Sequence, residues 1–554
     1  MIRKWWKEAI GYQIYPRSYL DTNHDGIGDI RGIIDKLDYI ESLNVNLVWI
    51  SPFYPSPLDD NGYDISDFKG VDPQLGTLEE VKELIEKAHA KGIRIILDCV
   101  LNQSSDEHPW FIESRSSKNN EKRDYYIWAQ GKDNQPPNNW GSFFGESAWK
   151  YDKLTDEYYL KIFSDKMPDL NWSNPTLRQE MADIIRFWLD LGIDGFRMDA
   201  IAHLGKDMTL TDSTLESDER GIAYDWSKFS NRPQLFDYLQ ELHQKVFSHY
   251  DIVTIGEVGG GAKFPEGYKY TNPQNPSIDM VFNFDHTWHN MPYGYEVLTP
   301  EKFNTNVIAL KEDLDYWIQN SQKHNIHPPM YWLNHDHPRV LSQYGSLDYH
   351  RESGSMLGMV LLSLPGTPFI YNGEEIGMTN VDYTNPKDFK DVNTRNYFKN
   401  NAHRLTIEQM MNHMRYTGRD NGHTPMQWNA NQHAGFSTTT PYLKLVSNYT
   451  TINVQDQENK EKSILNTYRT MAKIRKDNIQ LFAYGTFELI DAKHPDLFIF
   501  KRQFNQEKYI LIANFRDYEV PYQLPKYQEV TFHNYDNLAN AKLRPYEAIL
   551  LKES

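Results

Sequence analysis

Gly195-Phe196-Arg197-Met198-Asp199-Ala200 is the segment from which the architecture of the whole chain can be worked out. It follows a helical pattern at residues 181–191 and a short turn, so it is predicted to be a buried strand. Arg197 and Asp199 stand two residues apart, and alternate residues of a strand face the same side. A cation and a carboxylate therefore share one space, which is costly on a buried strand unless both are satisfied. A structural ion pair and a functional site both fit this segment taken alone.

Seven further strand-like segments accompany this one, with helical patterns such as residues 30–43 and 77–91 between them. They are predicted at residues 10–15, 45–50, 93–100, 252–257, 278–284, 330–336 and 368–374. Strands and helices that alternate in this way predict consecutive βα units around a parallel sheet, whose strands are apolar because both faces are covered. Eight such strands favour a (β/α)8 TIM barrel over an open sheet, with the active site at the carboxyl ends of the strands.

Two segments break the alternation, and 554 residues are too many for one compact core. Residues 104–172, rich in Asn, Asp, Ser, Lys and Trp, are predicted to be a subdomain inserted after the third strand. Residues 481–554 are predicted to form a C-terminal antiparallel β-sandwich, with strands at 482–490, 497–504, 509–514 and 548–551. The barrel then comprises residues 1–103 and 173–480.

The composition excludes some classes of partner. A formal net charge of −18 argues against nucleic acid and against anionic membrane surfaces. The single cysteine, Cys99, lies in an apolar run and is expected to be buried and structural rather than reactive, and one cysteine fits a reducing compartment. The first residues lack the apolar core of a signal peptide, and no segment has the roughly 18 apolar residues that span a bilayer. We therefore expect a soluble cytoplasmic protein.

Residues 21–29, Asp-Thr-Asn-His-Asp-Gly-Ile-Gly-Asp, resemble the ligand pattern of a calcium loop. Oxygen-bearing side chains stand at alternate positions, and Gly26 permits a sharp bend. The final bidentate Glu of a helix–loop–helix calcium site is missing, so the segment is not that motif, and a solvated Asx-rich turn is the alternative. We expect a structural Ca²⁺, with Mg²⁺ as the second choice and no organic cofactor, held by Asp21, Asn23, Asp25, Ile27 and Asp29.

Three carboxylates end predicted strands and so should meet at one mouth: Asp199, Glu257 and Asp336. Three acids at close range cannot all ionise without cost, so their surroundings must separate their pKa values. One ionised nucleophile and one protonated donor is the combination that glycoside cleavage needs. Arg197 is predicted to keep Asp199 ionised, and Glu257, at the end of an apolar strand, to be the proton donor.

Four motifs at predicted strand ends resemble those of glycoside hydrolase family 13, the α-amylase family: residues 98–103, 195–200, 256–258 and 334–336. Further segments at 167–172, 366–375 and 419–428 are similar to the oligo-1,6-glucosidase/α-glucosidase branch. The resemblance runs nearly end to end, and it is more specific for the family than for the substrate.

The resemblance implies that Asp199 is a nucleophile forming a β-glycosyl-enzyme, that Glu257 is the general acid and then base, and that Asp336 stabilises an oxocarbenium-like sugar. It implies a closed pocket that removes single glucose units with retention from the non-reducing end of a small oligosaccharide. The protein would act as a monomer or homodimer. The substrate-binding residues are expected to be Asp60, Tyr63, Gln103, Phe163, Arg197, Ala200, His335 and Arg419.

Three positions bear on the substrate. Gln103 replaces the usual His of the first motif, and a Gln can hydrogen-bond a hydroxyl but cannot carry charge. Ala200 stands where α-1,6-specific relatives carry Val, and Met167 where many carry Gln. Both are similar to α-1,4-preferring relatives, so the sequence predicts an α-glucosidase acting on maltose and short malto-oligosaccharides.

Four alternatives remain open. An oligo-1,6-glucosidase would share every catalytic residue and cleave isomaltose and isomalto-oligosaccharides. A trehalose-6-phosphate hydrolase would need a cationic patch for the phosphate, and a sucrose-active transglucosidase would differ only in the acceptor. Non-enzymatic heavy chains of amino-acid transporters are membrane-anchored and lack the full set of carboxylates that this chain has.

Overall fold

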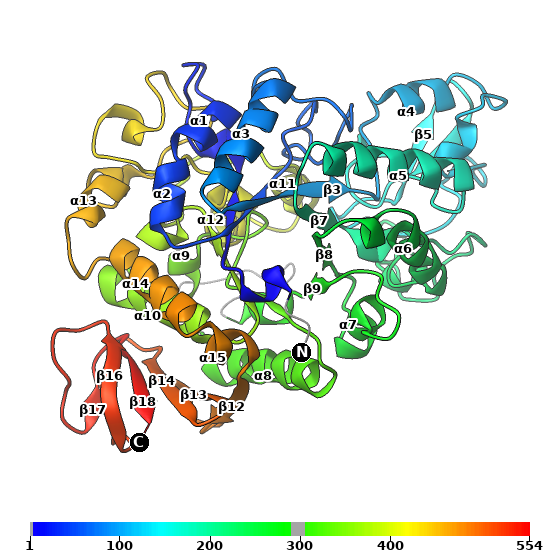
Figure 1. The fold of residues 1–554 in the computed structure, drawn as a ribbon. Helices are drawn as coiled ribbons and strands as arrows, with labels where there is room; N and C mark the ends of the chain where they lie inside the picture. Colours follow the sequence, from blue (N-terminus) through cyan, green and yellow to red (C-terminus); the bar gives the residue numbers. More distant parts are fainter. Residues whose placement is uncertain (1–3, 290–304, 554) are drawn as a thin grey trace.

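The computed structural model describes residues 4–289 and 305–553, and a barrel of eight parallel strands forms its centre (Figure 1). The strands follow one another in the order β10-β11-β1-β2-β3-β7-β8-β9, and the two end strands also touch, so the barrel is nearly closed. Residues 1–3 and residues 290–304 of the predicted barrel lie outside the described residues. The strands are β1 (Gly11–Ile14), β2 (Leu47–Ile50), β3 (Arg94–Val100), β7 (Gly195–Asp199), β8 (Val253–Glu257), β9 (Met280–Phe282), β10 (Pro329–Tyr331) and β11 (Thr367–Tyr371).

Helices cover the outside of the barrel, as expected for βα units. In α3 (Leu78–Ala90), Thr77 and Glu80 form a capping box, and Val81, Leu84, Ile85 and Ala88 make the buried stripe. No helix among the described residues is long and apolar enough to cross a membrane. The other helices up to the C-terminal domain are α1 (Ile30–Asp35), α2 (Leu37–Ser42), α5 (Pro175–Asp190), α6 (Pro233–Lys245), α7 (Phe264–Thr271), α8 (Val307–Lys323), α9 (Val340–Tyr344), α10 (His350–Ser363), α11 (Val392–Asn401), α12 (Ile407–Thr417), α13 (Val454–Glu458) and α14 (Ile464–Asp477).

Strand β7 lies between β3 and β8, and its register positions the charged residues. Asp98 pairs with Arg197, Val100 with Asp199, and Met198 with Gly256. Gly195 makes the close approach to β8 feasible, because its φ is +140° and an added Cβ would lie 1.9 Å from the Val253 carbonyl oxygen. Cys99 on β3 is buried, and burial raises the pKa of its thiol, which keeps it protonated as the sequence led us to expect.

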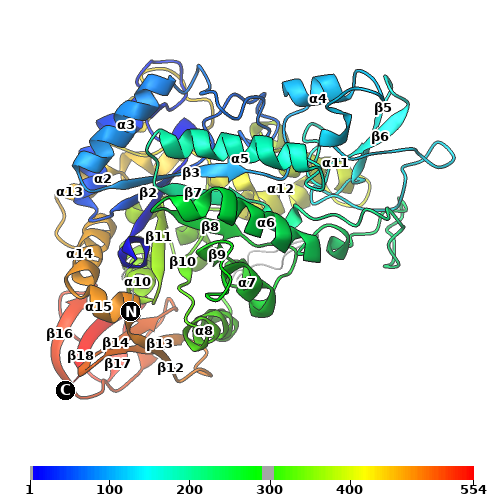
Figure 2. The same ribbon diagram turned by 45° about the vertical axis from the view of Figure 1, so that its right-hand side comes forward.

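The segment between β3 and α5 forms a small unit at one end of the molecule (Figure 2). It contains α4 (Pro109–Ser114) and a three-stranded sheet in the order β4 (Trp128–Ala129), β6 (Glu157–Leu160), β5 (Trp149–Asp152). Its apolar cluster includes Trp140, Trp149 and Leu160 and also Phe229, which comes from the loop after β7. This inserted unit and the loop after β7 therefore share one core.

The C-terminal unit lies at the opposite end of the molecule from the inserted unit in both views (Figures 1 and 2). It packs on α8 and α10. Its antiparallel sheet has the order β12 (Thr486–Ile490), β13 (Leu497–Phe504), β14 (Glu507–Asn514), β18 (Ala548–Glu553), β16 (Tyr527–His533), and a two-stranded pair is formed by β15 (Val520–Pro521) and β17 (Lys542–Leu543). Helix α15 (Ile479–Tyr484) precedes the sheet and spans the predicted boundary between residues 480 and 481.

Several predicted element limits were wrong. The predicted strand 482–490 begins as helix α15, and the strand starts only after Gly485. The predicted helix 30–43 is two helices separated at Lys36. The seventh and eighth barrel strands end at Tyr331 and Tyr371, earlier than predicted. Short apolar runs do not distinguish helix from strand by periodicity, which explains the first error.

Candidate active site

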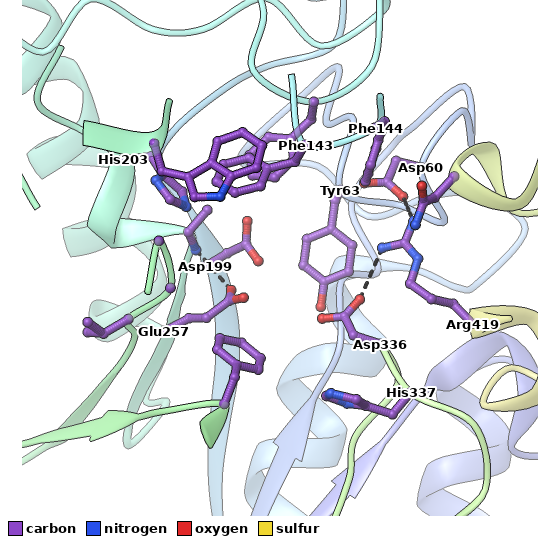
Figure 3. A pocket seen from close by; sticks show the side chains of 18 of the residues that line it. Asp60, Tyr63, Phe143, Phe144, Asp199, His203, Glu257, Asp336, His337 and Arg419 are labelled. Carbon is purple, nitrogen blue, oxygen red and sulfur yellow. Dashed lines mark hydrogen bonds and ion pairs between the residues drawn. The ribbon is translucent and has the colours of Figure 1, made fainter. Parts of the chain in front are cut away.

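A pocket of about 470 Å³ opens at the carboxyl ends of the barrel strands (Figure 3). Arg197 lies directly beneath it and is fully buried. All the other residues that the sequence predicted to be catalytic or substrate-binding line the pocket: Asp60, Tyr63, Gln103, Phe163, Asp199, Ala200, Glu257, His335, Asp336 and Arg419. The structure thus brings together residues that follow five strands (β2, β3, β7, β8 and β10) with others from the inserted unit and the segment after α12.

Arg197 is the centre of the first charged cluster. Its Nη1 donates to Asp98 Oδ1 at 2.7 Å and to Asp199 Oδ1 at 2.6 Å, and its Nη2 donates to Glu257 Oε2 at 2.6 Å. Asp98 also accepts a hydrogen bond of 2.7 Å from Trp49 Nε1. One guanidinium therefore holds three carboxylates, of which Asp98 belongs to a quoted motif but was not singled out from the sequence.

The geometry at the end of β7 leaves one oxygen of each catalytic candidate available. Ala200 has a left-handed φ of 47°, and its N–H donates to Glu257 Oε2 at 3.0 Å. That oxygen also accepts from Arg197, so the carboxylate is held from two sides. Asp199 Oδ2 and Glu257 Oε1 have no hydrogen-bond partner within residues 4–289 and 305–553, and both side chains line the pocket.

Arg419 is the centre of a second charged cluster on the other side of the pocket. Its Nη1 lies 3.1 Å from Asp336 Oδ1, and its Nη2 lies 2.5 Å from Asp60 Oδ1 and 2.6 Å from Asp391 Oδ2. Asp391, the residue before α11, is one that the sequence analysis missed, because no motif or periodicity surrounds it. Figure 3 shows this cluster facing Asp199 and Glu257 across the pocket.

His335 lines the pocket and contacts Asp336 of the second charged cluster. Its Nε2 lies 2.6 Å from the Tyr63 hydroxyl and 3.5 Å from Asp336 Oδ2, and its Nδ1 lies 2.8 Å from Gln13 Nε2. The rings of His335 and Tyr63 stack with an interplanar angle of 8°. Burial lowers the pKa of His335 to about 3, so the ring is neutral near pH 7. A neutral ring with fixed partners can bind a hydroxyl without adding charge.

Gln103 also lies where its side-chain amide could hydrogen-bond a sugar hydroxyl. It is buried, its Nε2 donates to the Tyr63 carbonyl at a long 3.4 Å, and its Oε1 accepts from Asn102 Nδ2 at 3.0 Å. Met167 and Ala200, the positions that bear on linkage, are buried and line the same pocket.

The carboxyl groups in the pocket have separated pKa values, though not in the pattern predicted. Burial raises the pKa of Asp199 well above its ordinary value, and the nearby Glu257 adds to this, whereas Arg197 opposes it. Burial also disfavours ionisation of Asp336, but the neighbouring His335 and the guanidinium of Arg419 outweigh it and lower that pKa. Because His335 is neutral near pH 7, the guanidinium is the main attraction there.

The prediction that Arg197 keeps Asp199 ionised therefore stays a prediction, because burial raises the pKa of Asp199 in the free protein although Arg197 opposes the shift. One guanidinium charge is shared among three carboxylates, so its attraction for Asp199 offsets only part of the cost of burial. Asp60 is in the same situation: despite its contact with Arg419, burial and the neighbouring Asp391 raise its pKa to about 7.

The predicted calcium loop is held in shape largely by hydrogen bonds from backbone N–H groups to its own carboxylates. Asp21 accepts from the N–H groups of His24 and Gly26, and Asp29 accepts from those of Thr22 and Gly32. Asn23 and Asp25 are exposed, as they would need to be to reach an ion at the surface. No group of three His, Cys, Asp or Glu side chains is arranged as metal ligands anywhere in the described residues. A Ca²⁺ here would therefore depend on the Asn23 and Ile27 oxygens as well as on carboxylates.

Comparison with known proteins gives matches along the whole chain. A model of the alpha amylase catalytic domain matches residues 13–485. An oligo-1,6-glucosidase of Bacillus cereus is 44% identical over 566 residues, which cover 100% of both chains. The structure of a trehalose-6-phosphate hydrolase of Bacillus licheniformis is 36% identical with a TM-score of 0.92, over 99% of this chain and 100% of that one. An isomaltulose synthase of Erwinia rhapontici in complex with sucrose is 34% identical with a TM-score of 0.93, over 100% of this chain and 99% of that one.

Proposed function

Because this chain belongs to the α-amylase family of glycoside hydrolases, we propose that it is a retaining α-glucosidase removing single glucose units from short α-1,6-linked oligosaccharides. The α-1,6 linkage is supported by the end-to-end relative that is named an oligo-1,6-glucosidase. The sequence favoured maltose-type α-1,4 links, so these comparisons support the alternative better than the main prediction.

The observation that carries the proposal is the shared guanidinium. Arg197 contacts Asp199 and Glu257 at 2.6 Å each, so two carboxyl groups from adjacent strands face one point at the mouth of the barrel. Their remaining oxygens, Asp199 Oδ2 and Glu257 Oε1, face a pocket that also contains groups suited to sugar hydroxyls. Two carboxyl groups on either side of a glycosidic bond are what retaining hydrolysis requires.

In the proposed mechanism, Asp199 Oδ2 attacks the anomeric carbon while Glu257 Oε1 gives its proton to the leaving oxygen. The glucosyl ester that forms is then attacked by a water whose proton Glu257 takes back, so the α configuration is restored. Because Asp199 and Glu257 lie so close together, burial disfavours a negative charge on both at once, and it raises the pKa of Asp199. The productive complex has the proton of this pair on Glu257.

Exo action is supported by the far side of the pocket. Arg419 bridges Asp60 and Asp336 there, and in this proposal these ion pairs close the pocket beyond the first sugar. Tyr63, Gln103 and His335 supply polar atoms at the same end. One terminal glucose would be enclosed, and the rest of the substrate would leave by the mouth.

An α-1,4 preference remains a second candidate, because the small side chain of Ala200 lies in the pocket beside the nucleophile.

Trehalose 6-phosphate is less favoured as a substrate. Arg419 is the only Lys or Arg in the lining among the described residues, and it is already bound to three carboxylates. The described part of the lining therefore offers no further Lys or Arg for a phosphate.

Initial rates on isomaltose, maltose, sucrose, trehalose and trehalose 6-phosphate would test the proposal, with Asp199→Ala as the blank. We expect the fastest glucose release from isomaltose and none in the blank. Faster release from maltose would keep the mechanism and favour the second candidate. Activity that persists in Asp199→Ala would contradict the proposed nucleophile.

A further inference from the structure

An aromatic wall made by Phe143, Phe163 and Trp226 lines the pocket and has no part in the proposed chemistry. Phe143 lies between the other two rings: its centroid is 5.3 Å from that of Phe163 with an interplanar angle of 22°, and 4.3 Å from that of Trp226 with an angle of 16°. Phe143 and Phe163 come from the inserted unit, whereas Trp226 comes from the loop after β7. The wall is thus built from two separate parts of the fold.

The loop that carries Trp226 is locally well fixed. Trp226 begins a short 3-10 helix (Trp226–Lys228), and Asp225 caps this helix by accepting from the Ser227 N–H at 3.1 Å. The other carboxylate oxygen of Asp225 accepts from Ser213 Oγ at 2.7 Å and so ties the helix to the preceding part of the loop. The indole is held by a turn rather than by a free chain.

The loop is also joined to the inserted unit by backbone hydrogen bonds. The Gly141 N–H donates to the Ala223 carbonyl at 2.9 Å, and the Ala223 N–H donates to the Asn139 carbonyl at 2.7 Å. Trp140 Nε1 donates to the Thr211 carbonyl at 2.9 Å. These contacts hold the two halves of the aromatic wall in register, so the indole is positioned before any sugar arrives.

The wall lies on the cleavage side of the pocket. The ring centroid of Phe143 lies 4.8 Å from that of His203, four residues after Asp199, and Figure 3 shows His203 and Phe143 above Asp199. Since the end closed by Arg419 takes the terminal glucose in the proposed function, this side meets the sugar that leaves. A pyranose has one apolar face and polar edges, which suits an aromatic ring with a polar tip.

Trp226 has the surface that such a contact needs. Phe143 covers one face of the indole, but the residue is only half-buried and lines the pocket. Its Nε1–H has no hydrogen-bond partner in the described part of the chain, so it is a free donor. We propose that Trp226 is a specificity residue that binds the leaving sugar through its indole. This inference rests on the proposed glucosidase function.

The test compares substrates with and without a leaving sugar: isomaltose and maltose against α-D-glucopyranosyl fluoride, whose leaving group is fluoride. In Trp226→Ala we expect kcat/KM for the better disaccharide to fall roughly tenfold, within the range that apolar pocket contacts contribute. The value for the fluoride should stay within about twofold of the wild type. Trp226→Phe keeps a ring and loses the N–H. Its kcat/KM for the disaccharide should lie between that of the wild type and that of Trp226→Ala.

An equal loss on the fluoride and the disaccharides would overturn the inference, and so would no loss on either. Leu215→Ala is the matched control, since Leu215 lies on the same loop with 53% of its surface exposed and does not line the pocket. It should leave all three rates unchanged. If the wild type hydrolyses none of the three substrates, the proposed function fails instead, so the two failures are distinguishable.

Discussion

At the scale of single residues, Arg197 and Arg419 each hold three carboxylates, and these contacts organise the pocket. Lysine could not replace Arg197, because a single ammonium lacks the planar fork that reaches Asp98, Asp199 and Glu257 together. We expect Arg197→Lys to lower kcat/KM on the best disaccharide roughly 100-fold or more, since misplaced catalytic groups lose rate on this scale. Initial rates would measure this, with circular dichroism to show that the variant is folded. A loss below about tenfold would contradict the role given to the fork.

Ala200 is expected to affect both the substrate preference and, through its backbone conformation, the stability. Its φ of 47° is unfavourable for a β-branched residue. We expect Ala200→Val to raise the ratio of the kcat/KM for isomaltose to that for maltose, because the added methyl groups reshape the pocket beside the nucleophile. We also expect a lower Tm, because the valine would be strained at this φ. Ala200→Gly is the matched control, since it relieves the strain without filling the pocket and should leave the ratio close to that of the wild type. A ratio unchanged in Ala200→Val would show that this position does not set linkage.

Glu374, outside the pocket, gives a pH prediction. It is buried, accepts from the Tyr468 hydroxyl at 2.8 Å, and burial raises its pKa to about 8. The folded state therefore binds its proton more tightly than the unfolded state, whose pKa is about 4.3. The stabilising contribution of Glu374 is complete below the unfolded-state pKa of about 4.3. It is lost as the pH rises through the folded-state pKa of about 8.

Glu374→Gln keeps the shape and removes this titration. We expect the Tm of the variant relative to the wild type to be higher at pH 8.5 than at pH 5, with the activity at pH 7 unchanged. Thermal unfolding at the two pH values would measure it. A Tm difference that is the same at both would mean that Glu374 does not titrate in this window.

At the scale of elements, the sequence was a good guide where the pattern is long and regular. The strands β3, β7 and β8 and the helix α3 lie within a few residues of their predicted limits. It failed at α15, where a short, mostly apolar run fits either helix or strand. Strand β16 was missed because its residues are mostly exposed and show no apolar alternation. The motifs located the three carboxylates, but Asp391 and Trp226 come from loops whose positions only the tertiary fold determines.

The loop at residues 21–29 is the element whose metal content remains a proposal. If Ca²⁺ binds the oxygens of Asp21, Asn23, Asp25, Ile27 and Asp29, it stabilises the folded state by mass action, by about 2.7 kcal/mol at 100 times its Kd. We expect EDTA to lower Tm and Ca²⁺ to restore it, with Mg²⁺ restoring less. Asp25→Asn, which changes an exposed side chain, should weaken Ca²⁺ binding in calorimetry. An unchanged Tm and no binding heat would instead favour the Asx-rich turn.

At the scale of the whole molecule, the C-terminal unit is attached to the barrel by two buried cations, Arg502 and Arg475, that have no carboxylate partner among residues 4–289 and 305–553. Arg502 on β13 donates to the carbonyls of Ser363, Leu481, Phe482 and Gly485, at the ends of α10 and α15. Arg475 on α14 donates nearby to the carbonyls of Leu362 and Leu364. Helix ends have unpaired carbonyls and a partial negative charge, so these guanidiniums satisfy both.

The contacts of Arg502 are remote from the pocket, because the C-terminal unit and the inserted unit lie at opposite ends of the molecule (Figure 1). Arg502→Met would remove five hydrogen bonds to backbone carbonyls, each worth on the order of 1 kcal/mol, while relieving repulsion from Arg475. We therefore expect a Tm lower by several degrees and an unchanged kcat/KM below the transition. Lys501→Met is the matched control: Lys501 is also on β13, and the change removes its partly exposed 2.8 Å ion pair to Glu553 on β18 and should change Tm little. Equal Tm values for the two variants would mean that the hydrogen bonds to the helix ends do not hold the C-terminal unit in place. A lower kcat/KM in folded Arg502→Met would show instead that the unit influences the pocket from a distance.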